Sequence, residues 1–126
     1  MSLKDGCLYF IPDCSVSFPV KNKYAICISH EYNLWYLVNS CDEKRPYSHE
    51  LSDVVYIEPI HFKSLYHRSY INIKNIRLLS EGDISKASEC GVMSNDLWLK
   101  IMSSVQNSRS LQRKYKEQMK NIKKYK

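Results

Sequence analysis

Residues 23–39 read KYAICIS-HEYN-LWYLVN, and they define the centre of the expected fold. Two apolar runs, rich in β-branched and aromatic residues, flank a short polar link, which is a pattern typical of a β-hairpin. Successive side chains point to opposite faces of a strand, and both faces of each run are mostly apolar. We therefore expect two central strands that are covered on both sides. In a chain this short, such strands are hidden by curling the sheet into a small barrel or by laying a helix across it.

Further strand candidates lie on either side of this hairpin. The first is residues 4–11, where Gly6 permits a bend and the pair Pro12-Asp13 ends the run. Later candidates are residues 53–58, 69–73 and 75–79, with a single helical turn expected within residues 61–67.

Two helices are expected in the C-terminal half. Residues 80–83 form a turn that can cap a short helix to about Ala87, and Gly91 is expected to end that segment as a left-handed cap. Ser94 is a good N-cap for the last helix, in which Leu97, Ile101 and Val105 recur every four residues and form an amphipathic stripe. No proline or glycine follows, so this helix can continue into the tail.

The order of these elements favours a mainly β (α+β) fold. We expect a small, strongly bent antiparallel β-barrel with a C-terminal helix, because five or six short strands and a terminal helix fit a curved barrel. At 126 residues one domain is expected, and we assign it to residues 1–108. Residues 109–126 are expected to form a basic tail that is helical or frayed.

Composition narrows the class of protein. No apolar run approaches the roughly 20 residues that span a bilayer, and residues 1–6 lack the layout of a signal peptide. We therefore expect a cytoplasmic protein without a membrane partner. Five cysteines, an odd number without paired spacing, argue against a disulfide framework and against a zinc site. No metal and no cofactor are expected.

The positive charge is concentrated at one end of the chain. Residues 109–126 contain eight basic side chains and one acid, so the tail carries +7 while the whole chain carries +6. The other 108 residues therefore sum to −1. Such asymmetry is typical of a tail that contacts nucleic acid, although a solvated helix end has the same composition.

Several short sequence motifs occur in an order that is similar to that of a known family. They are Asp5-Gly6 in the first strand, a basic residue before a strand that ends in Ser (residues 23–29), Ser40 after the next strand, residues 69–79, and Gly91 before the capped helix. This order, over roughly residues 4–108, resembles the MazF/PemK family of toxin endoribonucleases, as a divergent member. The resemblance implies an SH3-like barrel, metal-independent cleavage of single-stranded RNA, an antitoxin partner and a homodimer.

The resemblance also suggests site residues. In the family, an Arg before the second strand and a Thr or Ser after the third perform cleavage, and by position these become Lys23 and Ser40. Lys23 is a departure, because a guanidinium can bridge two phosphate oxygens whereas an ammonium acts as a point charge. Arg45 in the loop of residues 40–50 is the candidate for the missing guanidinium.

Attack by a 2′-hydroxyl needs a base, an acid and groups that stabilise the phosphorane charge. Lys23 supplies charge, Ser40 a hydrogen bond, and His30 or His49 proton transfer near neutral pH. The residues expected to contact RNA are Lys21, Lys44, His49, Arg113, Lys114 and Lys116.

Each of these residues also has an ordinary interpretation. Lys23 can be a solvated residue at a strand start, Ser40 a turn-forming hydroxyl, and the histidines surface loop residues. A nucleophilic pair of Cys41 and His49 is not supported, because proximity in sequence does not bring side chains together. Two classes of function stay open: a toxin endoribonuclease, and a non-catalytic SH3-like module that binds a protein or a nucleic acid.

Overall fold

The computed structural model describes residues 3–17, 19–40, 53–120 and 122. Within them, six strands form one antiparallel sheet in the order β4-β5-β3-β2-β1-β6. The strands are β1 (Cys7–Cys14), β2 (Lys21–Ser29), β3 (Leu34–Ser40), β4 (Val54–Ile57), β5 (Ser69–Asn72) and β6 (Ser88–Val92). The helices are α1 (Glu81–Lys86), α2 (Asn95–Asn107) and α3 (Arg113–Met119), with a 3-10 turn, η2, at Pro59–His61.

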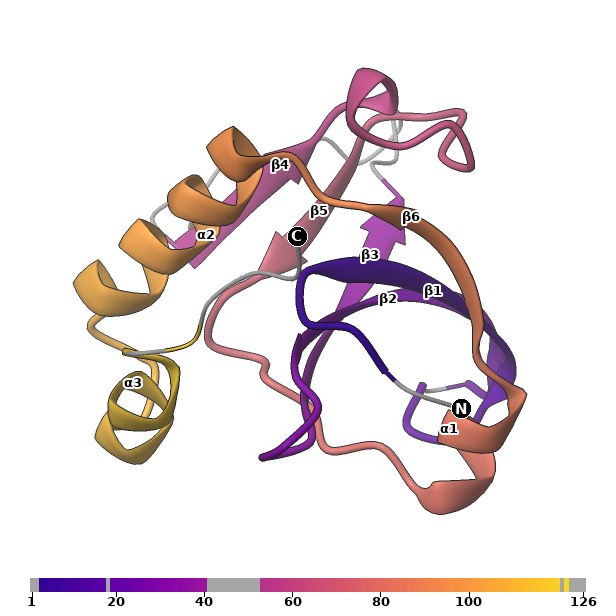
Figure 1. Ribbon diagram of the computed structural model, residues 1–126, viewed down its shortest axis with the longest axis horizontal. Helices are drawn as coiled ribbons and strands as arrows, with labels where there is room; N and C mark the ends of the chain where they lie inside the picture. The colour runs from indigo at the N-terminus through magenta and orange to yellow at the C-terminus, as the bar shows by residue number, and fades with distance from the viewer. Residues whose placement is uncertain (1–2, 18, 41–52, 121, 123–126) are drawn as a thin grey trace.

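The mainly β, antiparallel prediction with a C-terminal helix is confirmed. Strands β4 and β6 are the two ends of the strand order, so the sheet formed by the described residues is open and is not a closed barrel. Figure 1 shows α2 and α3 on one side of the molecule and α1 at the opposite side. In the part of the chain that the structure describes, no helix combines the length and apolar character that crossing a bilayer requires.

The expected central hairpin is present. Strands β2 and β3 pair with Tyr24 opposite Val38 and Cys27 opposite Trp35. Asn33 ends the link between them with φ 57°, a left-handed conformation that asparagine tolerates better than most residues. Its side chain donates to the Leu79 carbonyl at 2.8 Å and accepts from the indole of Trp35 at 2.8 Å. The hairpin turn is thereby fastened to a segment 46 residues further along the chain.

Both faces of the hairpin are buried, as the two-sided apolar pattern predicted. We call them the α2 face and the α1 face after the helices that cover them. The α2 face carries the larger core, which includes Leu8, Ile26, Ile28, Tyr36, Ile57, Ile71, Met93, Leu97 and Ile101. The α1 face carries a second core, which includes Cys7, Tyr9, Ile11, Ala25, Cys27, Trp35, Leu79 and Ala87.

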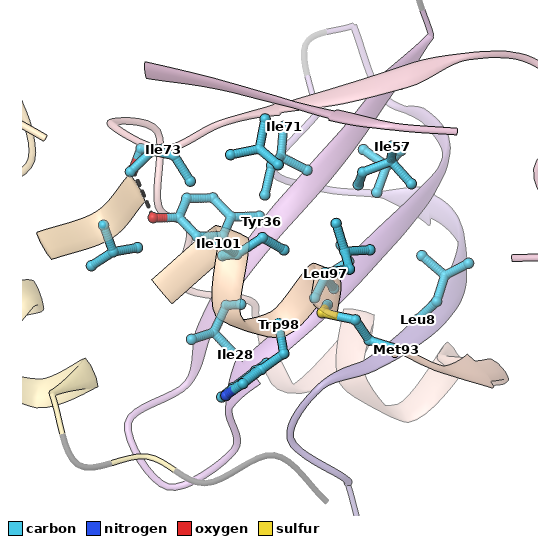
Figure 2. Close-up of a cluster of buried hydrophobic side chains, with 14 of the residues drawn as sticks. Leu8, Ile28, Tyr36, Ile57, Ile71, Ile73, Met93, Leu97, Trp98 and Ile101 are labelled. Carbon is cyan, nitrogen blue, oxygen red and sulfur yellow. Dashed lines mark hydrogen bonds between the residues drawn. The ribbon is translucent and has the colours of Figure 1, made fainter. Parts of the chain in front are cut away.

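The last helix has the predicted cap and stripe. The Ser94 hydroxyl accepts a hydrogen bond from the Leu97 amide at 3.2 Å, and Leu97, Ile101 and Val105 are buried against the sheet. Figure 2 shows Leu97, Trp98 and Ile101 of α2 within the same cluster as Tyr36, whose hydroxyl donates to the Ile73 carbonyl at 2.7 Å.

The helix does not continue into the tail, because Ser108 is extended and ends it. The Ser108 hydroxyl accepts from the amides of Ser110 and Leu111, and the chain then turns into α3. Leu111 and Met119 are buried in the α2-face core. Leu111 and Met119 therefore pack on the same core as the sheet and α2.

Two strand predictions were wrong. Strand β1 does not stop at Pro12 but runs to Cys14, because a bulge between Ile11 and Cys14 absorbs the proline, with Asp13 at φ 46°. Residues 75–79 do not form a strand and make one bridge, in which Arg77 and Trp35 exchange backbone hydrogen bonds of 2.8 and 2.9 Å.

Two turn predictions also need correction. Gly91 is not a helix cap but lies within β6 with φ 155°, and a Cβ added there would come within 3.4 Å of the Phe62 ring. A backbone φ of 155° is one that residues with a side chain rarely adopt, so the backbone conformation accounts for the glycine. The helical turn is η2, which begins at Pro59 rather than after His61, because proline is well suited to the first position of a helix.

Asp83 anchors α1 to the end of β1. Its carboxylate is almost fully buried and accepts from the Ser15 amide at 3.1 Å and the Ser15 hydroxyl at 2.6 Å, with the Lys86 ammonium at 3.8 Å. Burial raises the pKa of this carboxyl, but hydrogen bonds with Ser15 and Ser80 and the charge of Lys86 outweigh it, so the net pKa lies below the ordinary value.

We expect this anchor to make stability depend on acid pH. A carboxyl whose pKa is lower in the folded state stabilises the protein above its unfolded pKa of about 3.9, and this contribution is lost as the pH falls below that value. Asp83→Asn should lower the free energy of unfolding at pH 7 by about 1.5–3 kcal/mol and flatten its decline in acid. Urea denaturation between pH 7 and pH 3 measures both effects. Glu81→Gln, an exposed acid of the same helix, is the control and should behave like wild type.

Candidate nucleic-acid interface

Lys23 is the one buried cationic side chain among the residues that the structure describes. It lies near the start of β2, and its ammonium donates to the side-chain oxygen of Asn39 on β3 at 3.1 Å. Burial is the main cause that lowers the pKa of this ammonium, and the charge of Lys21 lowers it further, against a smaller opposing effect of Cys14. The site therefore holds a desolvated amine with one defined partner.

Strand register places three more side chains in one line with Lys23 across the neighbouring strands. Asn39 pairs with Tyr70 on β5, and Tyr70 pairs with Tyr56 on β4. The strand neighbours of these residues, such as Val38, Ile71 and Val55, belong to the α2-face core. Because side chains alternate along a strand, Lys23, Asn39, Tyr70 and Tyr56 leave the sheet on the other face. We call these four residues the polar row, and at about 4.8 Å per strand it is roughly 15 Å long.

Arg68 extends the polar row at its β4 end. It stands two residues before Tyr70, so it leaves the sheet on the same face. Its guanidinium carbon lies 4.0 Å from the centroid of the Tyr56 ring, and its Nε donates to the Glu58 carboxylate at 2.7 Å. The side chain is 55% exposed. The polar row thus has a buried amine at one end and an open guanidinium at the other.

Glu58, the partner of Arg68, is itself held by η2. Its backbone amide donates to Nδ1 of His61 at 2.9 Å, and its carbonyl accepts from the His61 amide at 2.9 Å. His61 is the last residue of η2 and closes this turn through its ring and its backbone amide. The backbone that carries the Glu58 carboxylate is therefore fixed on both sides.

Ser40 and Lys23 reach the same end of the sheet but do not converge. Ser40 is the last residue of β3, is exposed, and pairs with Ser69. It has the strand parity of Val38, whereas Lys23 has the parity of Ala25, so the two side chains leave opposite faces.

His30 lies far from both residues. It follows the other end of β2, seven residues from Lys23, which corresponds to roughly 20 Å along a strand. Its Nδ1 lies 2.9 Å from the Asp5 carboxylate, which also accepts from the His30 amide at 2.8 Å. The length of β2 therefore separates His30 from Lys23.

The remaining basic candidates are scattered. Lys21 is exposed at the start of β2, near Lys23. Arg113, Lys114 and Lys116 lie on α3, which buries Met119 in the α2-face core and is therefore on the side opposite the polar row. Arg113 lies 3.9 Å from Glu117, and Lys114 lies 4.9 Å from the Tyr115 ring centroid.

Four candidates, Cys41, Lys44, Arg45 and His49, lie outside the described residues. In the described parts, Cys14, Cys27 and Cys90 are free thiols, and burial raises the pKa of Cys27. Among the same residues, no three His, Cys, Asp or Glu side chains are grouped to hold a metal ion.

No family model matches this chain, and no curated protein matches it either. Its function is therefore inferred from the chemistry of the polar row. Sequence reasoning found Lys23 but missed Tyr56, Arg68 and Tyr70. The sequence did contain a signal for two of them. Arg68 and Tyr70 are two residues apart and precede the apolar Ile71, so strand alternation places the cation and the aromatic ring on one face.

Proposed function

We propose that the protein binds single-stranded RNA across the polar row, as a divergent module of SH3-like type. The observation that carries this proposal is the single row of a buried ammonium, an amide and two phenol rings at one end of the sheet. Cations neutralise the nucleic-acid backbone, and aromatic rings stack with bases whose faces are not already paired in a duplex. The short antiparallel strands followed by C-terminal helices support the SH3-like assignment, although the sheet is open.

Metal-independent cleavage of that RNA, as in a toxin endoribonuclease, is the second candidate function. It is favoured by the burial of Lys23, because desolvation lowers the pKa of the ammonium and a neutral amine can accept the proton of a 2′-hydroxyl. The opposite orientation of Ser40 and the distance of His30 do not support it. An antitoxin partner and a homodimer belong to this second candidate.

We expect Tyr70→Ala to weaken binding of a labelled single-stranded RNA by roughly 5- to 150-fold, the range reported for loss of one base–aromatic stack. Fluorescence anisotropy at low salt measures the dissociation constant. Tyr70→Phe keeps the ring and should bind like wild type, and so should Tyr32→Ala, which removes an exposed tyrosine from the hairpin turn. A wild-type protein that does not bind single-stranded RNA at low salt would contradict the proposal.

Cleavage is tested separately, with RNA incubated in EDTA. If Lys23 transfers the proton, the wild type cuts RNA in chelator and Lys23→Met does not, because methionine keeps the aliphatic stem without the amine. Ser40→Ala should retain activity if the opposite orientation of its side chain persists in the complex. RNA that stays intact with wild type, despite measurable binding, leaves the non-catalytic module as the function.

A further inference from the structure

We propose that Arg68 binds a phosphodiester group of the RNA, in an orientation set by Glu58 and Tyr56. This inference rests on the proposed RNA binding and adds to it the residue that contacts the backbone. An arginine presents five N–H donors in a planar fork that matches phosphate geometry, which a lysine ammonium does not.

The contacts of Arg68 leave one edge of its fork open. Its Nε donates to Glu58 and its flat face lies over the Tyr56 ring. Among the described residues these are its only partners, so the terminal nitrogens of the guanidinium are available to a ligand. Over half of the side chain is exposed, which gives a phosphate access to that edge.

The guanidinium is also oriented before any ligand arrives. Arg68 has many rotamers in solution, and fixing them on binding opposes affinity. Here the carboxylate of Glu58 and the ring of Tyr56 restrict those rotamers, and η2 holds the Glu58 backbone through His61. A carboxylate beside an anion site weakens anion binding by its charge, so Glu58 is compatible with this site only if orientation outweighs charge.

The place of Arg68 in the polar row suits a nucleic-acid strand. The tyrosine of the row nearest to it along the chain is Tyr70, two residues away on the same face, and Lys23 ends the row on the far side. An RNA strand that crosses the polar row from its Arg68 end meets the open guanidinium first and then the tyrosine rings. One nucleotide chain can therefore place a phosphate on Arg68 and a base on Tyr70.

The test is the salt dependence of RNA binding. For single-stranded nucleic acid, each phosphate contact adds roughly 0.7 to the slope of log affinity against log salt concentration. Arg68→Ala should reduce that slope by about 0.7 and weaken binding about tenfold or more at low salt. Arg68→Lys should keep the slope but lose affinity, because it keeps the charge without the fork. Lys100→Ala, which removes an exposed charge from α2, is the matched control and should change neither quantity.

Glu58→Leu separates orientation from charge, because leucine removes both the charge and the oxygen that accepts from Arg68 Nε. If Glu58 acted through its charge alone, its removal would tighten RNA binding; if it orients Arg68, the variant binds more weakly than wild type. Tighter binding by Glu58→Leu would overturn the positioning role. An unchanged slope and affinity in Arg68→Ala, with a wild type that binds, would overturn the phosphate contact and leave RNA binding intact. A wild type that does not bind RNA would overturn both proposals.

Discussion

Trp35→Ala is expected to lower the free energy of unfolding by roughly 3–5 kcal/mol, as truncation of a large core side chain does. Trp35 is fully buried near the start of β3, and its ring packs edge-on against Tyr9 with centroids 5.5 Å apart. Its indole nitrogen donates to Asn33 at 2.8 Å. The substitution therefore opens a cavity in the α1-face core. It also removes the indole N–H that donates to Asn33, the side chain that links the hairpin turn to Leu79.

Chemical denaturation measures this loss, and Trp35→Phe is the matched control. Phenylalanine keeps an aromatic ring against Tyr9 but cannot donate to Asn33, so we expect a smaller loss than for alanine. Asn33 would still bond to the backbone of Leu79. A change below about 1 kcal/mol in Trp35→Ala would be that of an ordinary surface substitution and would contradict the burial of this ring.

Trp98→Ala should have an effect of similar size, because it detaches α2 from the sheet. Trp98 is 6% exposed and lies in the α2-face core, so its truncation is expected to cost roughly 3–5 kcal/mol. The neighbouring Leu99 is 63% exposed, and Leu99→Ala should change stability by no more than about 0.5 kcal/mol. Equal destabilisation by the two variants, measured in parallel urea titrations, would mean that the helix face was assigned incorrectly.

The fold could be predicted from the sequence in segments where a single periodic pattern of apolar residues was clear. The alternation in residues 23–39 predicted both buried faces of the hairpin, and the four-residue recurrence from Leu97 predicted the buried face of α2. The strand prediction for residues 75–79 failed because an apolar composition does not supply a pairing partner. Their backbone pairing with β3 is limited to the bridge between Arg77 and Trp35. The predicted continuation of the helix into the tail failed because the Ser108 hydroxyl accepts from the amides of Ser110 and Leu111, a local contact that hydrophobic spacing does not reveal.

The candidate site was less accessible to sequence reasoning. Lys23 and Asn39 face each other only because β2 and β3 pair in one register, and Tyr70 joins them through a strand some thirty residues later. Arg68 contacts Glu58, which lies at the other end of the connection between β4 and β5. Such contacts arise from strand pairing, so composition and motif spacing identify the residue types but not their neighbours.

The pairing of β1 with β6 has a consequence for protein synthesis. The first strand of the chain finds one of its two neighbours in the hairpin that follows it, but the other, β6, begins only at Ser88. Roughly 70 residues separate β1 from β6, so at about 5–20 residues per second the ribosome leaves one edge of β1 uncovered for about 4–15 s. An uncovered strand edge is a template for pairing with other chains. During translation, the nascent polypeptide is therefore most exposed to misassembly before β6 emerges, and chaperone demand should fall once it has.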